Sequence, residues 1–429
     1  MKTNKEATRA VPRRGPVMMR REVDAPYAWF RLAVSVLLSA IGGVGMWSVV
    51  VTLPAVQADF HAERGAASLP FTLSMIGFGI GGVIMGRMAD RRGVTLPVMI
   101  GAGSLGAGYM LASIAPGLLS FAAACALIGT FGTAATFVPL MADVSFWFEK
   151  RRGIAIAVCA CGNYVSGAVW PTLIEWVVRT HGWRAAHLAV GVFCVVVMPP
   201  LALLLRGRPP VTVAGSAVIA LPSRRIALPP RVLQTLLSLA GLACCVAMAM
   251  PQVHIVAYCD DLGYGATRGA QMLSLMLGSG IISRVGSGFL ADRLGGVPTL
   301  LIGSFAQMVA LTLYMMLDGL TSLYVISILF GLFQGGLVPS YAIIVRESFP
   351  ANQAGARVGV ILMLTLLGMA FGGWISGAIF DLTGSYRAAF ANGVAWNALN
   401  FLIAVFLLFR SPIIAPRSAT ARHARSATG

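Results

Sequence analysis

The sequence predicts an all-α integral membrane protein, with twelve transmembrane helices in two pseudo-symmetric six-helix bundles. Three observations carry this prediction: the composition, a series of long apolar runs, and an internal repeat. Of the 429 residues, 57% are hydrophobic and only 11% are charged, and the mean hydropathy is +0.81. A soluble globular domain normally has about 25% charged residues. The composition therefore excludes a soluble protein.

Each apolar run approaches the roughly 20 residues that an α-helix needs to cross a bilayer. Six runs precede a polar segment and six follow it, which gives the expected helix count. The first six predicted helices span residues 31–54, 67–88, 96–114, 118–145, 153–178 and 186–205. The second six span residues 232–257, 269–290, 298–317, 321–345, 356–380 and 388–409.

The basic residues indicate the orientation of these helices. With both termini cytoplasmic, 26 of the 32 Lys and Arg residues fall in cytoplasmic segments, Arg31 and the tails included. The opposite side holds five, and Arg284 lies within a helix. This bias follows the positive-inside rule. The net charge of +17 therefore indicates a multi-pass protein of the cell (inner) membrane, with the lipid bilayer and not nucleic acid as its partner.

The same patterns divide the chain into five parts. Residues 1–29 form a basic cytoplasmic tail without the apolar stretch of a signal peptide. Residues 206–231 are basic and rich in proline, as expected of a cytoplasmic linker. We expect bundles over 30–205 and 232–410 and a second tail over 411–429. The seven cysteines show no metal-ligand spacing, so we expect neither a metal nor any other cofactor.

The two bundles share a sequence repeat. The pattern G-x-x-A-D-R-x-G occurs at residues 86–93 and again at 288–295, an offset of 202. Phe137-Val-Pro139 matches Leu337-Val-Pro339, and Trp183-Arg-Ala-Ala186 resembles Tyr386-Arg-Ala-Ala389. Several matches at nearly one spacing indicate an internal duplication.

Two such halves, with this motif after helices two and eight, resemble the major facilitator superfamily of secondary transporters. The resemblance covers roughly residues 28–410. It implies that the motif loops control the conformational change, because the glycines allow close helix contact and the acidic residue pairs across the two halves. The gating residues implied are Gly86, Asp90, Arg91 and Gly93, with Gly288, Asp292 and Arg293 as the second copy.

A second motif narrows the resemblance to one group of that family. The start of the fifth helix, residues 147–167, is similar to a signature of monocarboxylate and oxalate/formate transporters. The matching residues are Phe148, Arg152, Ala155, Val158, Gly162 and Gly167. The small residues among them, Ala155, Gly162 and Gly167, also favour close helix packing.

Arg284 is the main candidate for substrate binding. It lies in the apolar run 272–290, where a permanent charge is costly and usually has an anion to bind. The resemblance implies that this arginine binds the substrate carboxylate. The chain departs from relatives at Gly280, where several have an acidic or amide residue, and at Phe137, where a tyrosine is common. The alternative is an arginine that pairs with a neighbouring helix or reaches toward the cytoplasmic face.

Four other polar residues are candidates for the same site: His254, Asn163, Gln334 and Tyr341. Each has an alternative structural role as a hydrogen-bonded residue that bridges helices. Glu175 and Asp381 lie near the outer ends of their helices, where we expect contact with water.

Charge counting suggests the substrate. One buried cation matches one negative charge, so we expect a monocarboxylate or similar monoanionic organic acid, carried by alternating access and functional as a monomer. The mechanism we expect is proton-linked symport, in which protons are a partner beside the substrate. The alternative mechanism is anion exchange of the oxalate/formate type. Drug efflux and a membrane sensor on a transporter scaffold stay as alternatives. Five scattered histidines do not indicate an enzyme.

Overall fold

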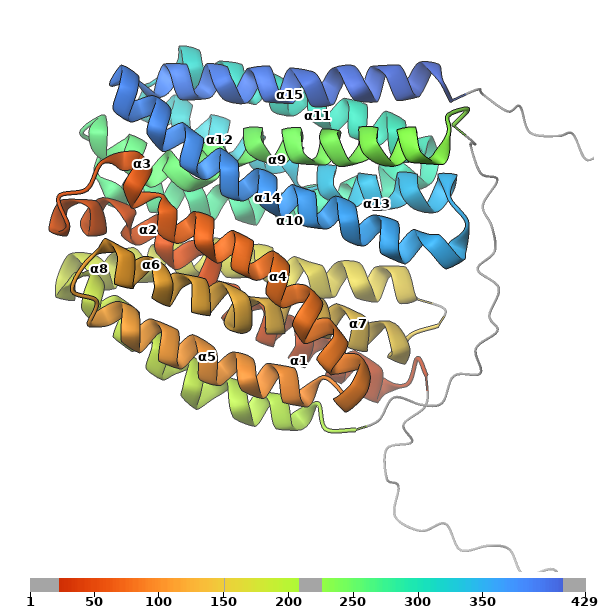
Figure 1. Cartoon of the computed structure of the whole chain (residues 1–429), viewed down its shortest axis with the longest axis horizontal. Helices are drawn as coiled ribbons and strands as arrows, with labels where there is room; N and C mark the ends of the chain where they lie inside the picture. Colours follow the sequence, from red (N-terminus) through yellow and green to blue (C-terminus); the bar gives the residue numbers. More distant parts are fainter. Residues whose placement is uncertain (1–22, 150, 208–225, 412–429) are drawn as a thin grey trace, which may run out of the picture.

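Twelve apolar helical spans run side by side along the molecule in the computed structural model, which describes residues 23–149, 151–207 and 226–411 (Figure 1). Eleven helical segments of the described chain are long and apolar enough to cross a membrane. One of these, Gly153–Leu204, has 52 residues and turns at Gly182, whose φ of 85° is not helical. It therefore contains two spans, and the prediction of twelve is confirmed.

The first half contains spans one to six. Three of these spans are interrupted or bent: span one at Gly43, span two at Ser68, and span four through a π-helical turn and a 3₁₀ turn. The elements are α1 (Pro26–Gly42), α2 (Val44–Asp59), α3 (Arg64–Ala67), α4 (Leu69–Arg92), α5 (Thr95–Ser113), α6 (Leu118–Leu127), the turns at Ile128–Gly132 and Thr133–Thr136, α7 (Val138–Trp147) and α8 (Arg152–Leu204).

The second half repeats this order with fewer interruptions. Only its tenth span is divided, between Gln334 and Leu337. The elements are α9 (Pro230–Asp261), α10 (Ala266–Leu294), α11 (Gly296–Met316), α12 (Leu320–Gln334), α13 (Leu337–Ser348), α14 (Ala351–Thr383) and α15 (Tyr386–Phe409). The predicted span ends differ from these bounds by a few residues, as expected of apolar runs whose end turns are more polar.

The repeat is visible in the packing of both halves. Gly129 faces α4 so closely that an added Cβ would lie 2.2 Å from the carbonyl oxygen of Ser74. Gly331, 202 positions later, faces α10 in the same way, and its added Cβ would lie 2.0 Å from the oxygen of Met276. Small residues allow such close approach between membrane helices. The interruptions of spans four and ten therefore coincide with equivalent glycine contacts.

The duplicated motif ends its helices with equivalent turns. Gly93 follows α4 with a φ of 82°, and Gly295 follows α10 with a φ of 91°. In each turn the glycine N–H donates to the carbonyl of the alanine four residues earlier, Ala89 or Ala291. This backbone conformation is unfavourable for other L-residues, which explains why each motif ends in glycine.

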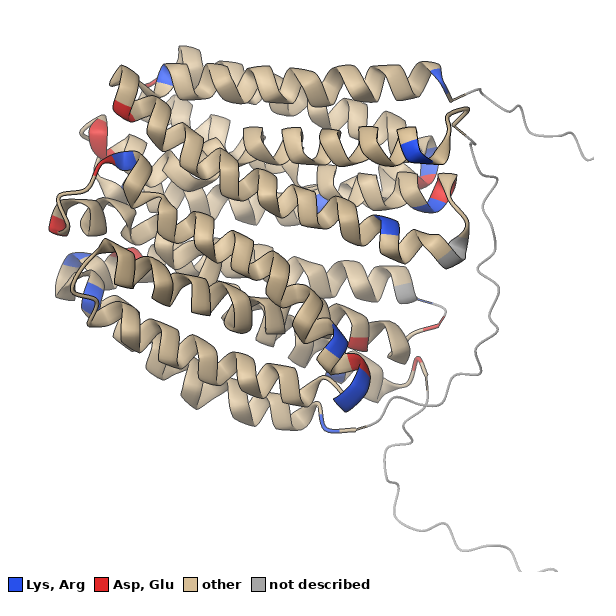
Figure 2. Cartoon of the chain, viewed as in Figure 1, with Lys and Arg blue, Asp and Glu red and all other residues tan. Residues whose placement is uncertain are grey.

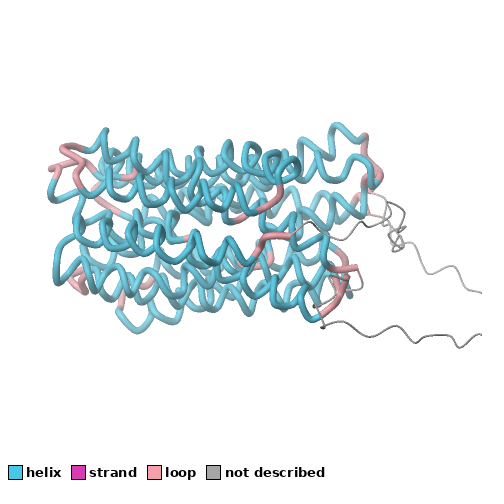
Figure 3. Tube along the Cα trace, turned by 90° about the horizontal axis from the view of Figure 1, so that it is seen from below, coloured by secondary structure: helices cyan, strands magenta, loops and turns pink. Residues whose placement is uncertain are grey.

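The halves lie side by side, with the first half in the lower layer and the second in the upper layer of Figure 1. They meet where α8 packs on α10, α4 on α14, and α2 on α9. Turns and loops collect at the two ends of the bundle (Figure 3), as do most charged residues (Figure 2). We call the end where the described chain begins and finishes the termini end, and the opposite end the distal end.

Candidate substrate site between the two halves

Arg284 lies in α10 at the interface with the first half, and its guanidinium makes only neutral contacts. Its Nη1 donates to the carbonyl oxygen of Ala160 in α8 at 3.2 Å, and its Nε donates to that of Gly335 at 3.4 Å. Its Cζ lies 4.6 Å from the centre of the Tyr164 ring. Among the described residues no carboxylate lies within ion-pair distance of this guanidinium.

Asn163 contacts other helices of the first half. It precedes Tyr164 in α8, and its Nδ2 approaches the Met46 sulfur at 3.5 Å. Its buried Oδ1 has no hydrogen-bond partner within the described chain, and the nearby Ser166 hydroxyl is equally unpartnered. Buried polar atoms normally find partners, so these two groups are available to a ligand or water.

Gln334 forms a hydrogen bond with Gln252 of α9, whose Nε2 donates to the Gln334 Oε1 at 2.6 Å. Gln334 is 1% exposed, and its own Nε2 has no described partner. This residue also ends α12, just before the interruption that places Gly335 beside Arg284. Gln334 thus directly precedes the residue whose carbonyl accepts from the arginine.

His254 and Tyr341 make their contacts elsewhere in the second half. The Nε2 of His254 lies 2.8 Å from the carbonyl oxygen of Gly373, and its Nδ1 lies 3.4 Å from the Tyr386 hydroxyl. The Tyr341 hydroxyl donates to the carbonyl of Ala240 and the side chain of Asn400. No described contact joins either residue to Arg284. Their positions fit the alternative role of bridging helices.

The distal end is closed by an ion cluster between the halves. The Nη2 of Arg64, in α3, donates to both carboxylate oxygens of Asp261 at 2.9 and 3.0 Å. The backbone N–H groups of Arg64 and Gly65 donate to Asp381 of α14 at 2.8 and 2.6 Å. We call this cluster of Arg64 with Asp261 and Asp381 the distal clamp; the Arg64 side chain is only 8% exposed, whereas the two aspartates are exposed.

Glu175 adds a second distal contact between the halves. It accepts a hydrogen bond from the Thr267 hydroxyl at 2.5 Å and is only 6% exposed. Its place near the outer end of a helix predicts contact with water, but the closed interface between α8 and α10 buries it. Asp381, by contrast, is exposed as expected.

Charges near the clamp do not all join it. Asp59 pairs with Arg184 inside the first half at 2.5 Å, where both side chains are more than 40% exposed. Arg268 is exposed and donates only to Gln271, one turn along its own helix. These residues therefore stabilise single halves and not the contact between them.

The halves separate toward the termini end. A Cβ added at Gly153 of α8, Gly288 of α10, or Gly355 and Gly359 of α14 would meet nothing within 4 Å. In contrast, Gly79 and Gly373, farther from this end, face side chains of the opposite half. These four positions all lie on the same side of Arg284 as the termini.

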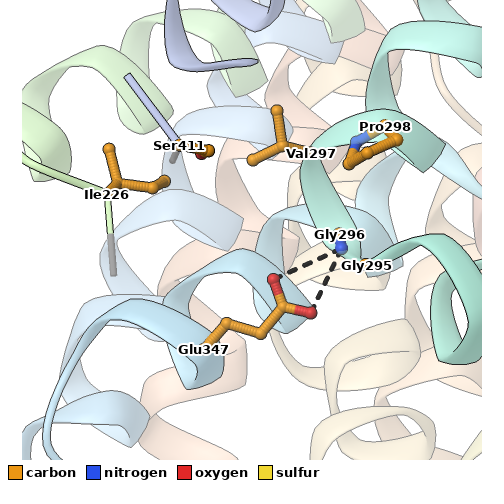
Figure 4. A pocket seen from close by; sticks show the side chains of 7 residues that line it. All are labelled: Ile226, Gly295, Gly296, Val297, Pro298, Glu347 and Ser411. Carbon is orange, nitrogen blue, oxygen red and sulfur yellow. Dashed lines mark hydrogen bonds between the residues drawn. The ribbon is translucent and has the colours of Figure 1, made fainter. Parts of the chain in front are cut away.

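The gating residues implied by the resemblance are largely exposed at the termini end. Asp90, Arg91, Asp292 and Arg293 are exposed and form no ion pair with other described residues. The turn after α10 is held by Glu347 of α13, whose carboxylate oxygens accept from the Gly296 N–H at 3.2 and 3.3 Å (Figure 4). Within the part of the chain that the structure describes, neither motif loop forms an ion pair with the opposite half.

Sequence reasoning missed a buried ion pair in the first half. The Nε and Nη2 of Arg31 donate to the two oxygens of Asp143 at 2.6 and 2.8 Å, and the residues are 1% and 7% exposed. Arg31 had been counted with the cytoplasmic segment, but α1 begins at Pro26 and carries it inside. The one available signal was a lone aspartate within a predicted helix.

Comparison with known proteins now decides the family. A family model described as the Major Facilitator Superfamily matches residues 35–326 and, in a second match, residues 287–428. The chain belongs to the Major Facilitator Superfamily. The transporter is 28% identical over 335 residues to monocarboxylate transporter 13 of Rattus norvegicus, covering 76% of this chain and 74% of the relative. It is 27% identical over 364 residues to monocarboxylate transporter 13 of Bos taurus, covering 82% of each.

Solved structures share the fold of this transporter. The chain matches a bacterial homologue of the human lysosomal transporter Spinster, in an inward-facing and occupied conformation, with a TM-score of 0.66. The match covers 90% of this chain and 97% of the other, at 14% identity. The expected resemblance to the monocarboxylate transporter group and the expected all-helical membrane fold are both confirmed.

Proposed function

We propose that this transporter carries a small monocarboxylate by alternating access, with Arg284 as the group that binds the carboxylate. The single observation that supports this proposal is the unpaired guanidinium between the halves. The two arginines that are buried among the described residues, Arg31 and Arg64, each have a carboxylate partner. A charge of this kind is costly within a membrane unless an anion accompanies it. Because Arg284 supplies one positive charge, we propose a substrate with one negative charge.

The conformation supports binding from one side. The distal clamp joins the halves, whereas the termini end is open around α8, α10 and α14. The excess of Lys and Arg in segments at the termini end supports a cytoplasmic position for that end, in the cell (inner) membrane. We therefore assign this structure to the inward-facing state.

We propose proton-linked symport as the coupling mechanism, with the proton carried by the substrate. The buried carboxylate Asp143 has both oxygens bonded to Arg31, so we assign the proton to the substrate and not to this pair. Exchange of one anion for another is the second candidate. It is favoured by the same unpaired Arg284, because an occupied site lowers the cost of moving the charge. Neither mechanism requires chemical conversion of the substrate, so we do not propose an enzyme.

The first test is uptake of labelled small monocarboxylates into proteoliposomes by the wild type and by Arg284→Leu. We expect a loss of at least about 100-fold in uptake, because a charge-assisted pair contributes about 3 kcal/mol or more when buried. Arg268→Leu is the matched control, since it removes an exposed arginine from the same helix. Retained uptake in Arg284→Leu, with normal insertion, would refute the assignment.

The second test addresses the charge of the substrate and the coupling. Oxalate and malonate should compete at least tenfold less well than monocarboxylates, because a second carboxylate has no second cation. An inward pH gradient should drive accumulation if symport is correct. Counterflow that ignores the pH gradient would favour exchange instead.

A further inference from the structure

We infer that Tyr164 is the positioning residue of the substrate site: its ring fixes the guanidinium of Arg284 from the opposite half, in a socket that Gly280 leaves open. This inference rests on the proposed function, because it concerns how the arginine receives a carboxylate. Tyr164 belongs to α8 and Arg284 to α10, so the contact joins the two halves at the site itself.

The first step is the geometry of the cation. The Cζ of Arg284 lies 4.6 Å from the Tyr164 ring centre, within the range of a cation–π interaction. Two backbone carbonyls, of Ala160 and Gly335, hold its Nη1 and Nε. The Nη2 atom makes no hydrogen bond within the described chain. The ring covers a face of the guanidinium, whereas a carboxylate binds at its edge, so both partners can be present together.

The second step is the position of Gly280, one helical turn before Arg284. A Cβ added there would lie 2.4 Å from the Cε1 and 2.7 Å from the Cδ1 of Tyr164. These distances are shorter than real contacts, so any larger residue would displace the ring. The glycine and the tyrosine therefore fit one another, and the ring rests on α10 between positions 280 and 284.

The third step concerns the hydroxyl of Tyr164. It forms no hydrogen bond with a described residue, whereas other buried tyrosines, such as Tyr109 with Ser48, do. The ring is therefore the part of Tyr164 that contacts the site. Phenylalanine at this position should preserve the arrangement, and an aliphatic residue should not.

The experiment compares Tyr164→Leu, Tyr164→Phe and Gly280→Ala in monocarboxylate uptake and ligand-induced thermal shift. We expect Tyr164→Leu and Gly280→Ala to raise KM roughly tenfold with little change in maximal rate, because a cation–π contact of this kind is worth about a factor of ten. Tyr164→Phe should resemble the wild type. The double variant Tyr164→Leu/Gly280→Ala should be no worse than Tyr164→Leu alone, since the clash disappears with the ring.

Gly278→Ala is the matched control, because it lies on the same helix and faces the same interface. A Cβ added there would lie 3.7 Å from the Ala168 side chain, which is an ordinary contact and not a clash. Additive effects in the double variant, or an unchanged KM in Gly280→Ala, would overturn the inference. If Tyr164→Leu does not fold, the comparison of KM between Gly280→Ala and Gly278→Ala tests the inference: a raised KM in Gly280→Ala alone supports it, and equal KM values overturn it. A wild type that binds no monocarboxylate would refute the proposed function, whereas normal wild-type binding with unchanged Tyr164→Leu affinity would refute only the role of Tyr164.

Discussion

At the scale of single residues, the buried Arg31 and Arg64 and the partly buried Arg284 differ in the groups that contact their charge. Arg31 has a bidentate aspartate, Arg64 has an aspartate from the other half, and Arg284 has an aromatic ring and two carbonyls. Only the last arrangement leaves the positive charge without a negative partner. The type of partner therefore separates the two arginines that form ion pairs from the one that we propose for substrate binding.

Removing one member of the Arg31–Asp143 pair should be more harmful than removing both. Asp143→Leu should lower stability by about 3–5 kcal/mol, because it leaves a buried charge alone. The double variant Arg31→Leu/Asp143→Leu should recover part of this loss. Melting curves in detergent would measure both effects. Arg184→Leu, which breaks an exposed pair, should cost about 1 kcal/mol or less. An Asp143→Leu protein as stable as this control would contradict the argument.

Sequence alone identified Arg284, because a charge within an apolar run is conspicuous. It could not identify Tyr164, since which helix face an aromatic ring occupies depends on how α8 packs against α10. Nor could it pair Arg31 with Asp143, which are 112 positions apart. His254 and Tyr341 looked equally suitable in sequence, but their hydrogen bonds lie within the second half.

At the scale of helices, glycine contacts set how closely spans two and four, and spans eight and ten, approach. The predicted spans agree with the observed helices because apolar length alone determines them. The interruptions of spans four and ten did not follow from apolar length, although the repeated Val-Pro pairs mark both places. Their cause is tertiary contact with α4 and α10.

Alanine at Gly129 or Gly331 should therefore destabilise the protein. The added methyl would meet a backbone oxygen at 2.2 or 2.0 Å, and overpacking of this kind costs about 1–3 kcal/mol. Gly103→Ala in α5 is the control, because its Cβ would meet nothing within 4 Å. Melting temperatures of the three variants would test this. Equal stability of Gly129→Ala and Gly103→Ala would show that the close contact is unimportant.

At the scale of the whole molecule, the halves are held together at the distal end and separate at the other. Asp261→Asn should weaken the distal clamp and increase the outward-open population. Spin labels at the exposed residues His61 and Leu382, one in each half, should show a longer distance component. Asp59→Asn, which affects a pair inside one half, should leave the distribution unchanged. A distribution that Asp261→Asn does not alter would mean that the clamp does not determine the closed state.

The distal clamp also has a symmetry-related counterpart whose residues do not pair with each other. Asp59 and Asp261 are 202 positions apart, and Arg64-Gly-Ala recurs as Arg268-Gly-Ala, so the duplication supplied two aspartates and two arginines. The contact Arg64–Asp261 uses one of each, while Arg268 and Asp59 have partners within their own halves. A perfectly two-fold arrangement would form both contacts and hold the distal mouth shut more firmly. The loss of symmetry at these positions leaves a closure that is easier to reverse, as repeated cycling requires.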